Sequence, residues 1–381
     1  MTKLYLASPI EPSGASWLIN CFLELGIKVS HKSVVDAVWR HVLPAPTPDC
    51  MWQPTTDGGH RLHPKATLLK KFLPILSRVD ALRFREDAEV EYVQDLPTSR
   101  HAGALVLYFV RDPRDSLYSA YCRLRPAIDY EAFLRLPDPD TLLERPAQWR
   151  LCVESWIALA RGNWFTFEDY KRDAAGLLRR VLEHVHIART AEEIDRAVRE
   201  SSFDKARDAE ERYRADHADD REIINRSGRA RDWLDRSESR HGAAMIESQA
   251  GAAMNSLGYE CAAVDGVAWI SPTLMRTLPI FARIALPESI RRATLDANAD
   301  ERSLENVRAF AGSVDEDYLR RTNLPNHRIE RLLESLELVA QTKRWELESR
   351  LSELRKHFAE GSEHQFAQMR DLLLQQRRRK H

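Results

Sequence analysis

Short apolar runs bounded by turn residues recur along the first half of the chain, and amphipathic stretches separate several of them. The runs cover residues 4–7, 90–93, 104–110 and 164–167. The run at 104–110 is apolar throughout, which is typical of a central parallel strand covered on both faces. Apolar residues recur at helical spacing over 145–160, 169–186 and 191–200, with Asp169 as the expected N-cap of the second helix. This alternation predicts an α/β protein with three layers and a central, mainly parallel sheet.

The pattern changes after about Gly258, where prolines interrupt an apolar stretch at 270–287 and Glu, Arg, Leu and Gln become frequent from Asn326 onward. We therefore expect one domain over residues 1–261 and an α-helical C-terminal extension over 262–381. The spacing of Leu347, Leu351, Leu354 and Phe358 suits a helix seam, but Lys343 and Gly361 interrupt it on either side. A long helix is therefore favoured over a sustained coiled coil, and the seam suggests self-association. The apolar stretch is expected to pack against the core or to contact a membrane surface peripherally.

Composition narrows the function classes. The formal net charge of the 381 residues is −1, which argues against nucleic acid as a partner, so an anion site has to be local. The short basic run at 377–380 is expected to be a solvated tail. The five cysteines are odd in number and lack CxxC spacing, which indicates neither a disulfide framework nor a zinc site. No apolar segment has the length of a signal peptide or a membrane span, and a cytoplasmic protein is expected.

Two segments have the chemistry of a phosphate site. After the first predicted strand the chain reads Ser13-Gly14-Ala15-Ser16-Trp17 and then enters a helical pattern. Small residues at a helix N-terminus let backbone N–H groups close around an anion. After the central strand, Asp112 and Pro113 begin a helix in which Arg111 and Ser119 are placed to face one phosphate. A plain turn in the first segment and a surface ion-pair cluster in the second are the structural alternatives.

These segments resemble the family of sulfotransferases that use 3'-phosphoadenosine-5'-phosphosulfate (PAPS). The family's phosphosulfate loop ends in Ser-Gly-Thr-Thr-Trp, and its 3'-phosphate segment reads Arg-[Asn/Asp]-Pro-[Lys/Arg]-Asp with a serine eight residues after the arginine. The segment from Arg226 to Trp233 is similar to the family's Arg-Lys-Gly-x-x-Gly-Asp-Trp. Phe167-Glu168-Asp169-Tyr170 and Ser201-Ser202-Phe203 are similar to the segments that flank the adenine. The resemblance covers roughly residues 3–260 and implies a P-loop NTPase-like fold.

The resemblance implies a nucleotide site in three parts. The 5'-phosphosulfate would contact Ser13, Gly14, Ala15 and Ser16. The adenine would lie among Trp17, Phe167, Ser201 and Phe203, and the 3'-phosphate would contact Arg111, Ser119, Arg226, Ser227 and Gly228. Asp232 and Trp233 would close the last loop without touching the nucleotide. The donor would be PAPS, the product adenosine 3',5'-bisphosphate (PAP), and no metal is expected.

The chain departs from the family at two catalytic positions. Pro12 stands where the family has a lysine or arginine that neutralises the departing phosphate oxygen, so that charge has to come from elsewhere. The candidates are Lys65, Lys70, Lys71, Arg61 and a re-aimed Arg114. Val93-Gln94-Asp95-Leu96-Pro97 stands where the family has Lys-Thr-His-Leu-Pro, so Asp95 is the expected general base. Ser119 is the other expected catalytic residue. A turn role for Asp95 and catalysis by His60 or His63 are the alternatives.

The expected activity is sulfuryl transfer from PAPS to a hydroxyl or amine, with a carbohydrate or glycoconjugate as the preferred acceptor because the candidate base is acidic. Two other functions remain open. Loss of the basic residue at Pro12 fits a catalytically impaired nucleotide-binding scaffold whose C-terminal helices mediate interactions. A P-loop kinase is disfavoured because the GxxxxGK[ST] signature is absent from the first turn.

Overall fold

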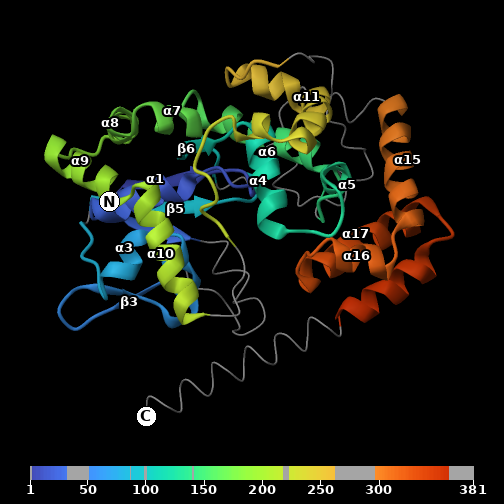
Figure 1. Ribbon diagram of the computed structural model, residues 1–381, viewed down its shortest axis with the longest axis horizontal. Coiled ribbons are helices and arrows are strands. Elements are labelled where there is room, and N and C mark those ends of the chain that lie inside the picture. Colours follow the sequence, from blue (N-terminus) through green and yellow to red (C-terminus); the bar gives the residue numbers. More distant parts are fainter. Residues whose placement is uncertain are drawn as a thin grey trace, which may run out of the picture. The chain divides into compact units, whose positions relative to one another are not determined.

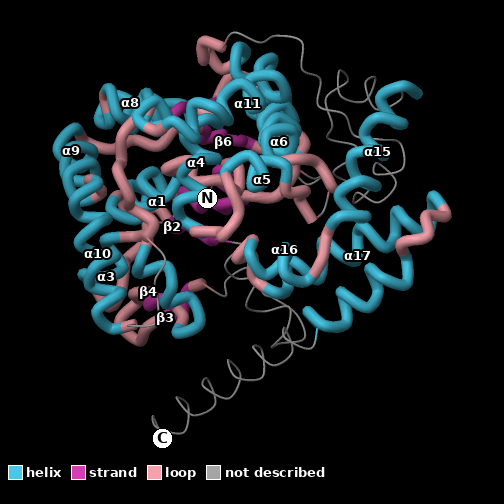
Figure 2. The backbone as a smooth tube through the Cα atoms, turned by 45° about the vertical axis from the view of Figure 1, so that its right-hand side comes forward, coloured by secondary structure: helices cyan, strands magenta, loops and turns pink. Residues whose placement is uncertain are grey.

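Five parallel strands form the central sheet of the protein, and helices lie around it (Figures 1 and 2). The strands are β1 (Thr2–Ala7), β2 (Lys28–His31), β5 (Ala88–Val93), β6 (Leu105–Val110) and β7 (Trp164–Thr166), in the order β2-β5-β1-β6-β7. Their four pairings are all parallel. The predicted α/β class with a central parallel sheet is thereby confirmed, and Val106 to Val110 of β6 are almost completely buried as expected.

The computed structural model describes residues 2–31, 51–85, 87–97, 101–139, 141–217, 223–261 and 297–359. The apolar stretch at 270–287 and the basic tail at 377–380 lie outside these residues. The chain divides into two compact units, one of Met1–Arg123 with Cys152–Arg236 and one of Leu124–Leu151 with Ser237–His381. The expected domain boundary at residue 261 stays a prediction.

Helices cover the sheet of the first unit. They are α1 (Ala15–Glu24), α3 (Pro74–Arg78), α4 (Pro113–Leu124), α7 (Phe167–Arg172), α8 (Ala174–His184), α9 (Ala191–Glu200) and α10 (Phe203–Asp216). Helix α9 packs on α1 and α8, and α10 packs on α3 and on the 3₁₀ helix η1 (Pro64–Lys71). A hairpin of β3 (Trp52–Pro54) and β4 (His60–Leu62) and a second 3₁₀ helix, η3 (Asp232–Asp235), complete the elements of this unit.

One helix start differs from the prediction. Thr166, and not Asp169, is the N-cap of α7: the Thr166 hydroxyl accepts the Asp169 N–H at 3.0 Å, while the Asp169 carboxylate accepts the Thr166 N–H at 3.4 Å. This reciprocal pair places Asp169 in the first turn as the second half of a capping box. The predicted helix over 169–186 is also two helices, because Asp173 ends α7 and caps α8 by accepting the Gly176 N–H at 2.8 Å.

The second unit is helical over its described residues, which confirms the helical C-terminal extension. It holds α5 (Tyr130–Arg135), α11 (Ser237–Ser256), α15 (Ala297–Ser313), α16 (Glu316–Arg321), α17 (Asn326–Lys343) and a helix over 348–359, while α6 (Arg145–Ala160) begins in it. Leu351 and Phe358 of the predicted seam are buried by the chain itself, and Arg355 pairs with Glu337 of α17 at 3.2 Å. Self-association through this seam stays a prediction.

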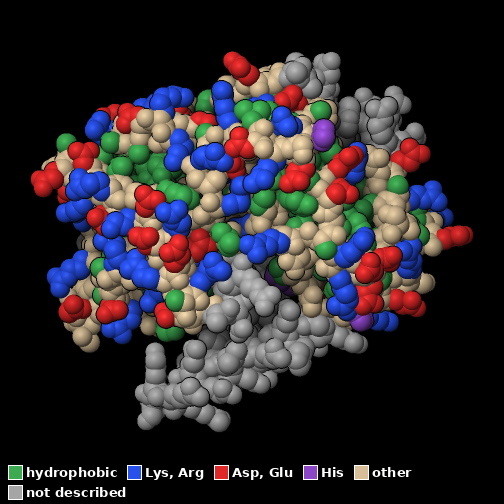
Figure 3. All heavy atoms as spheres, viewed as in Figure 1, with side chains coloured by type: hydrophobic (Ala, Val, Ile, Leu, Met, Phe, Trp, Pro, Cys, Tyr) green, Lys and Arg blue, Asp and Glu red, His purple; other side chains and the backbone are tan. Residues whose placement is uncertain are grey.

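Acidic and basic side chains are interspersed over the face seen in Figure 3, in keeping with the near-zero net charge. Among the described helices, none is both long and apolar enough to cross a membrane.

Candidate functional site

A cavity of about 440 Å³ opens beside the ends of β1 and β6, within the first unit. In the strand order β2-β5-β1-β6-β7 the chain changes direction between β1 and β6, and such a switch point at the carboxyl ends of parallel strands is where α/β proteins bind ligands. All residues assigned to the nucleotide from the sequence line this cavity: Ser13, Gly14, Ala15, Ser16, Trp17, Arg111, Ser119, Phe167, Ser201, Phe203, Arg226, Ser227 and Gly228. The structure therefore brings together segments more than 200 residues apart in the chain.

The loop after β1 offers the N-terminus of α1 to the cavity. Gly14 is the N-cap of this helix, with a left-handed φ of +86°, and no acidic side chain lies in the first turn. The Ser13 hydroxyl accepts the Ala15 N–H at 3.3 Å. A helix N-terminus without an acidic partner is a place where an anion is stabilised by backbone N–H groups and by the helix dipole.

Two glycines of the loops lie directly against two aromatic rings. A Cβ atom at Gly14 would come within 2.6 Å of the Phe167 ring, and one at Gly228 within 2.6 Å of the Phe203 ring. Gly228 also has a positive φ, of +61°. Both positions therefore require glycine for two reasons: the backbone has a positive φ, and an aromatic ring occupies the space of a Cβ atom.

The aromatic wall includes Tyr170, which belongs to a segment similar to those that flank the adenine but was not itself assigned to the nucleotide. Tyr170 stacks on Trp17 with ring centroids 4.3 Å apart, and its ring meets Phe167 edge to face at 5.5 Å. Burial raises the pKa of Tyr170 to about 12, so the phenol stays neutral. The Trp17 indole N–H is buried and has no partner among the described residues. The wall thus has flat apolar faces and an unused donor, as a purine site requires.

Ser201 is held in the same wall by a side chain of α1. Asn20 donates from Nδ2 to the Ser201 hydroxyl at 2.8 Å and accepts the Ile75 N–H on Oδ1 at 3.1 Å. Asn20 itself lines the cavity and is almost completely buried. This residue joins α1, α3 and the end of α9 at one point of the wall.

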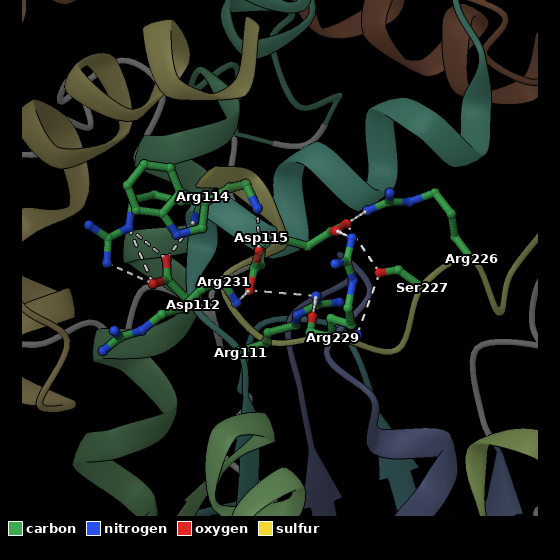
Figure 4. A network of polar contacts seen from close by, with 10 residues as sticks. Arg111, Asp112, Arg114, Asp115, Arg226, Ser227, Arg229 and Arg231 are labelled. Carbon is green, nitrogen blue, oxygen red and sulfur yellow. Dashed lines mark hydrogen bonds and ion pairs between the residues drawn. The ribbon is translucent and has the colours of Figure 1, made fainter. Parts of the chain in front are cut away.

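Arg111 follows β6 and lies at the centre of a buried charge cluster (Figure 4). Its Nη2 donates to the Arg229 carbonyl at 2.9 Å and lies 3.6 Å from the Asp115 carboxylate, and its guanidinium lies over the Phe167 ring at 4.4 Å. Its Nε is buried without a hydrogen-bond partner among the described residues. An orphaned guanidinium donor at a cavity wall is suited to a phosphate oxygen.

The ion pairs expected from the sequence around Arg111 do form, but they are buried. Arg114 donates to Asp112 at 2.7 and 3.0 Å and lies over the Trp233 ring at 4.5 Å. Both side chains are less than a tenth exposed. Arg114 does not line the cavity, so in this structure it is engaged in holding the segment together.

Three carboxylates hold the loop that carries Arg226. Glu210 of α10 accepts the backbone N–H groups of Ile224 and Asn225 at 2.6 and 2.8 Å, and the Asn225 amide at 3.0 Å. Asp232 accepts from the Arg226 guanidinium, the Ser227 hydroxyl and Arg229. Asp115 accepts the Arg231 and Trp233 N–H groups at 2.7 and 2.9 Å.

The pKa values of two of these carboxyls move in opposite directions. Burial raises the pKa of Asp232, but the hydrogen bond and charge of Arg226 outweigh that effect and the pKa is lowered overall. Burial raises the pKa of Asp115 more than the Arg111 charge lowers it. The Asp232 pair is therefore the more robust of the two toward acid.

Asp95, the candidate base, and those candidate cations whose side chains the structure describes do not line the cavity. Asp95 is exposed, its carbonyl accepts the Trp156 indole N–H at 3.0 Å, and it does not line the cavity, as His60 and His63 also do not. Arg61, Lys70 and Lys71 do not line it either, and the Lys65 side chain lies outside the described part of the structure.

Other residues that were not assigned to the site also line the cavity, among them Glu11, Tyr92, Gln94 and Arg123. Tyr92 and Gln94 are two apart along the strand direction of β5 and so share one face, and Arg123 shares a face of α4 with Ser119. Glu11 is buried beside Pro12 and also lines the cavity. The two-residue spacing of Tyr92 and Gln94, and the four-residue spacing of Ser119 and Arg123, were the sequence signals that could have pointed to these cavity residues.

The fold and this cavity define a nucleotide-binding protein of the P-loop-like α/β class. A model of the sulfotransferase domain family matches residues 93–245, a range that holds Arg111, Ser119, Phe167 and the Arg226 loop. Residues 93–245 are thus similar to a sulfotransferase domain, in agreement with the motifs, and this similarity supports sulfuryl transfer as the kind of activity. The loop of Ser13 and Gly14 lies outside the matched residues, and the cavity joins it to them.

Solved structures give a more distant likeness. A mouse sulfotransferase, SULT7A1, complexed with PAP is 16% identical over 66% of this chain and 84% of its own, with a TM-score of 0.40. Retinol dehydratase complexed with androsterone and PAP is 18% identical over 68% and 82%, and its complex with retinol and PAP is 18% identical over 69% and 83%, each with a TM-score of 0.42. No curated protein matches the sequence.

Proposed function

We propose that the cavity binds PAPS and that the enzyme transfers its sulfuryl group to a hydroxyl of an acceptor with an apolar body. The observation that supports the donor is the joint lining of one cavity by all three motif segments, with Arg111 Nε and Trp17 Nε1 left as buried donors. Arg111 offers a donor to a phosphate, and Trp17 offers a flat ring and a donor to a purine. An adenine nucleotide needs both in one cavity.

In this proposal, different residues of the cavity contact different parts of the nucleotide. Backbone N–H groups at Gly14 to Ser16 face the 5'-phosphate end, Arg111, Ser119 and the Arg226 loop hold the 3'-phosphate, and Trp17, Tyr170, Phe167 and Phe203 flank the base. When bound, PAPS supplies the sulfuryl group: the acceptor oxygen bonds to sulfur, the sulfur–oxygen bond to the phosphate breaks with its electron pair left on the phosphate, and the acceptor proton goes to a base. The protein contributes positioning and charge stabilisation.

The remaining wall of the cavity supports the acceptor class. Ile10, Leu68, Leu69, Phe72 and Leu73 line it, and Ile10 and Leu68 are 45% and 40% exposed, so this part of the wall offers apolar surface to a ligand. An aliphatic or aromatic alcohol would cover them, whereas a sugar would leave its hydroxyls without partners there. The preference for a carbohydrate acceptor depended on Asp95, which is not at this wall.

Calorimetry with PAP tests the donor site. Wild-type protein should bind PAP without metal and should bind ATP with magnesium far more weakly. Arg111→Met should weaken PAP binding by about ten- to a hundredfold, the range expected for one charge-assisted hydrogen bond to a buried phosphate. Arg207→Met is the matched control, because Arg207 lies on α10, pairs with Asp204 on the surface and does not line the cavity.

Two results would count against the proposal. Equal PAP affinity of the wild type and the Arg111 variant would remove the phosphate role of Arg111. Tight PAP binding without sulfuryl transfer to any alcohol, phenol or oligosaccharide would instead favour the impaired nucleotide-binding scaffold.

A further inference from the structure

Three of the described arginines line the cavity, and two of them belong to the proposed 3'-phosphate cluster. Among the described residues that line it, the charged bases are Arg111, Arg123 and Arg226, and no lysine is present. Arg111 and Arg226 are paired with Asp115 and Asp232 and belong to the 3'-phosphate cluster. Arg123 lies in the last turn of α4, whereas Arg111 precedes the first turn of that helix.

The helix geometry sets where Arg123 lies. Ser119 and Arg123 are four residues apart and share one face of α4, just over one turn or about 6 Å along the helix axis. Both line the cavity. If Ser119 contacts the nucleotide phosphate, the guanidinium of Arg123 begins one turn farther along the same wall, on the side away from Arg111.

Arg123 and the phosphosulfate loop line the same cavity. The Arg123 guanidinium lies 5.9 Å from the Phe72 ring centroid, and Tyr92 lines the cavity with both residues. The Tyr92 hydroxyl lies 2.7 Å from the Ser8 hydroxyl, and Ser8 begins the loop that continues through Pro12 to Gly14. Arg123 therefore lies at the apolar part of the cavity wall, with Phe72 and Leu68, in the cavity that the loop also lines.

We propose that Arg123 is the catalytic cation at the sulfuryl end of the cavity and takes the part that a basic residue at position 12 would have. The inference rests on the proposed function. As the sulfur–oxygen bond breaks, negative charge collects on the phosphate oxygen, and a guanidinium held beside the loop stabilises it. A planar fork also suits the several oxygens of a phosphosulfate better than a single ammonium.

The ratio of PAPS affinity to PAP affinity tests this assignment. PAP lacks the sulfuryl group, so Arg123→Met should leave PAP affinity within about twofold of wild type while PAPS affinity falls about tenfold. Turnover with any accepted alcohol should fall about a hundredfold or more. Arg123→Lys should recover part of the PAPS affinity. Arg207→Met again serves as the control.

Each alternative role has its own signature. If Arg123 only neutralises the C-terminal dipole of α4, the variant loses thermal stability but keeps the affinity ratio, which overturns the proposal. If it binds an anionic group of the acceptor, the acceptor KM rises and the ratio is again unchanged, which overturns the proposal equally. The wild type binds PAP in both cases, whereas absence of wild-type PAP binding would contradict the proposed function itself.

Discussion

Gly228 ties the backbone of the 3'-phosphate loop to an aromatic ring of the cavity. We expect Gly228→Ala to lower PAP affinity by about tenfold or more, because the new Cβ would come within 2.6 Å of Phe203 in a backbone with a φ of +61°. Gly162→Ala is the control: Gly162 has a φ of +93°, but a Cβ there meets nothing within 4 Å. Similar losses of PAP affinity in both variants would show that backbone strain, and not the Phe203 contact, is responsible.

Glu11 and Asp95 compete for the role of general base. Glu11 is buried and lines the cavity, whereas Asp95 is exposed and outside its wall. We expect Glu11→Gln to lower turnover about a hundredfold with PAP affinity retained, since a general base contributes about 10²–10⁴-fold. Asp95→Asn, measured in the same steady-state assay, should stay near wild type. The reverse pattern would restore Asp95 to the catalytic role expected from the sequence.

At the scale of elements, Glu210 of α10 holds the loop that carries Arg226 through hydrogen bonds. Glu210 accepts three N–H donors from residues 224 and 225 with its two carboxylate oxygens. In Glu210→Gln one oxygen becomes an amide that faces a donor, so we expect a loss of about 1–3 kcal/mol of loop stability and weaker PAP binding. Hydrogen exchange at Ile224 and Asn225, with calorimetry, would measure both.

The neighbouring acid provides the control for that experiment. Glu211 is exposed on the same helix, so Glu211→Gln removes an equal charge without touching the loop. If both variants bind PAP as the wild type does, the Glu210 contacts do not position the phosphate residues.

Local patterns predicted the elements unevenly. The apolar run of β6 and the helix over 145–160 were predicted with almost the observed bounds, since burial on both faces of a strand and helical spacing leave strong signals. The strand β2 was missed because Lys-Val-Ser-His contains one apolar residue. The N-cap of α7 was misplaced because Thr166 and Asp169 share a capping box and either can be taken for the cap.

The site was predictable where a motif fixes both residue type and position. Arg111, Ser119 and the Arg226 loop follow from such motifs, and each lines the cavity. Tyr170, Gln94 and Arg123 were not assigned to the site, because whether they line the cavity depends on which face of a helix or strand meets it. The catalytic role expected of Asp95 stays a prediction, although its side chain does not line the cavity.

At the scale of the whole molecule, the cavity belongs to one of the two units. A ligand stabilises only the part of a chain that binds it, so PAP at a hundred times its Kd should add about 2.7 kcal/mol to the unfolding free energy of the first unit. Scanning calorimetry should show a transition that moves upward with PAP. If two transitions are resolved, the one from the second unit should stay in place, and equal movement of both would indicate cooperative unfolding of the chain.

The arginines of the cavity have a consequence for chemical modification. Because the described residues that line it include three arginines and no lysine, a dicarbonyl reagent such as phenylglyoxal should inactivate the enzyme, and bound PAP should protect it. Acylation of amines, in contrast, should modify the outer surface and spare the nucleotide pocket. The protein could therefore be tethered through its surface lysines to a solid support with its binding pocket still accessible.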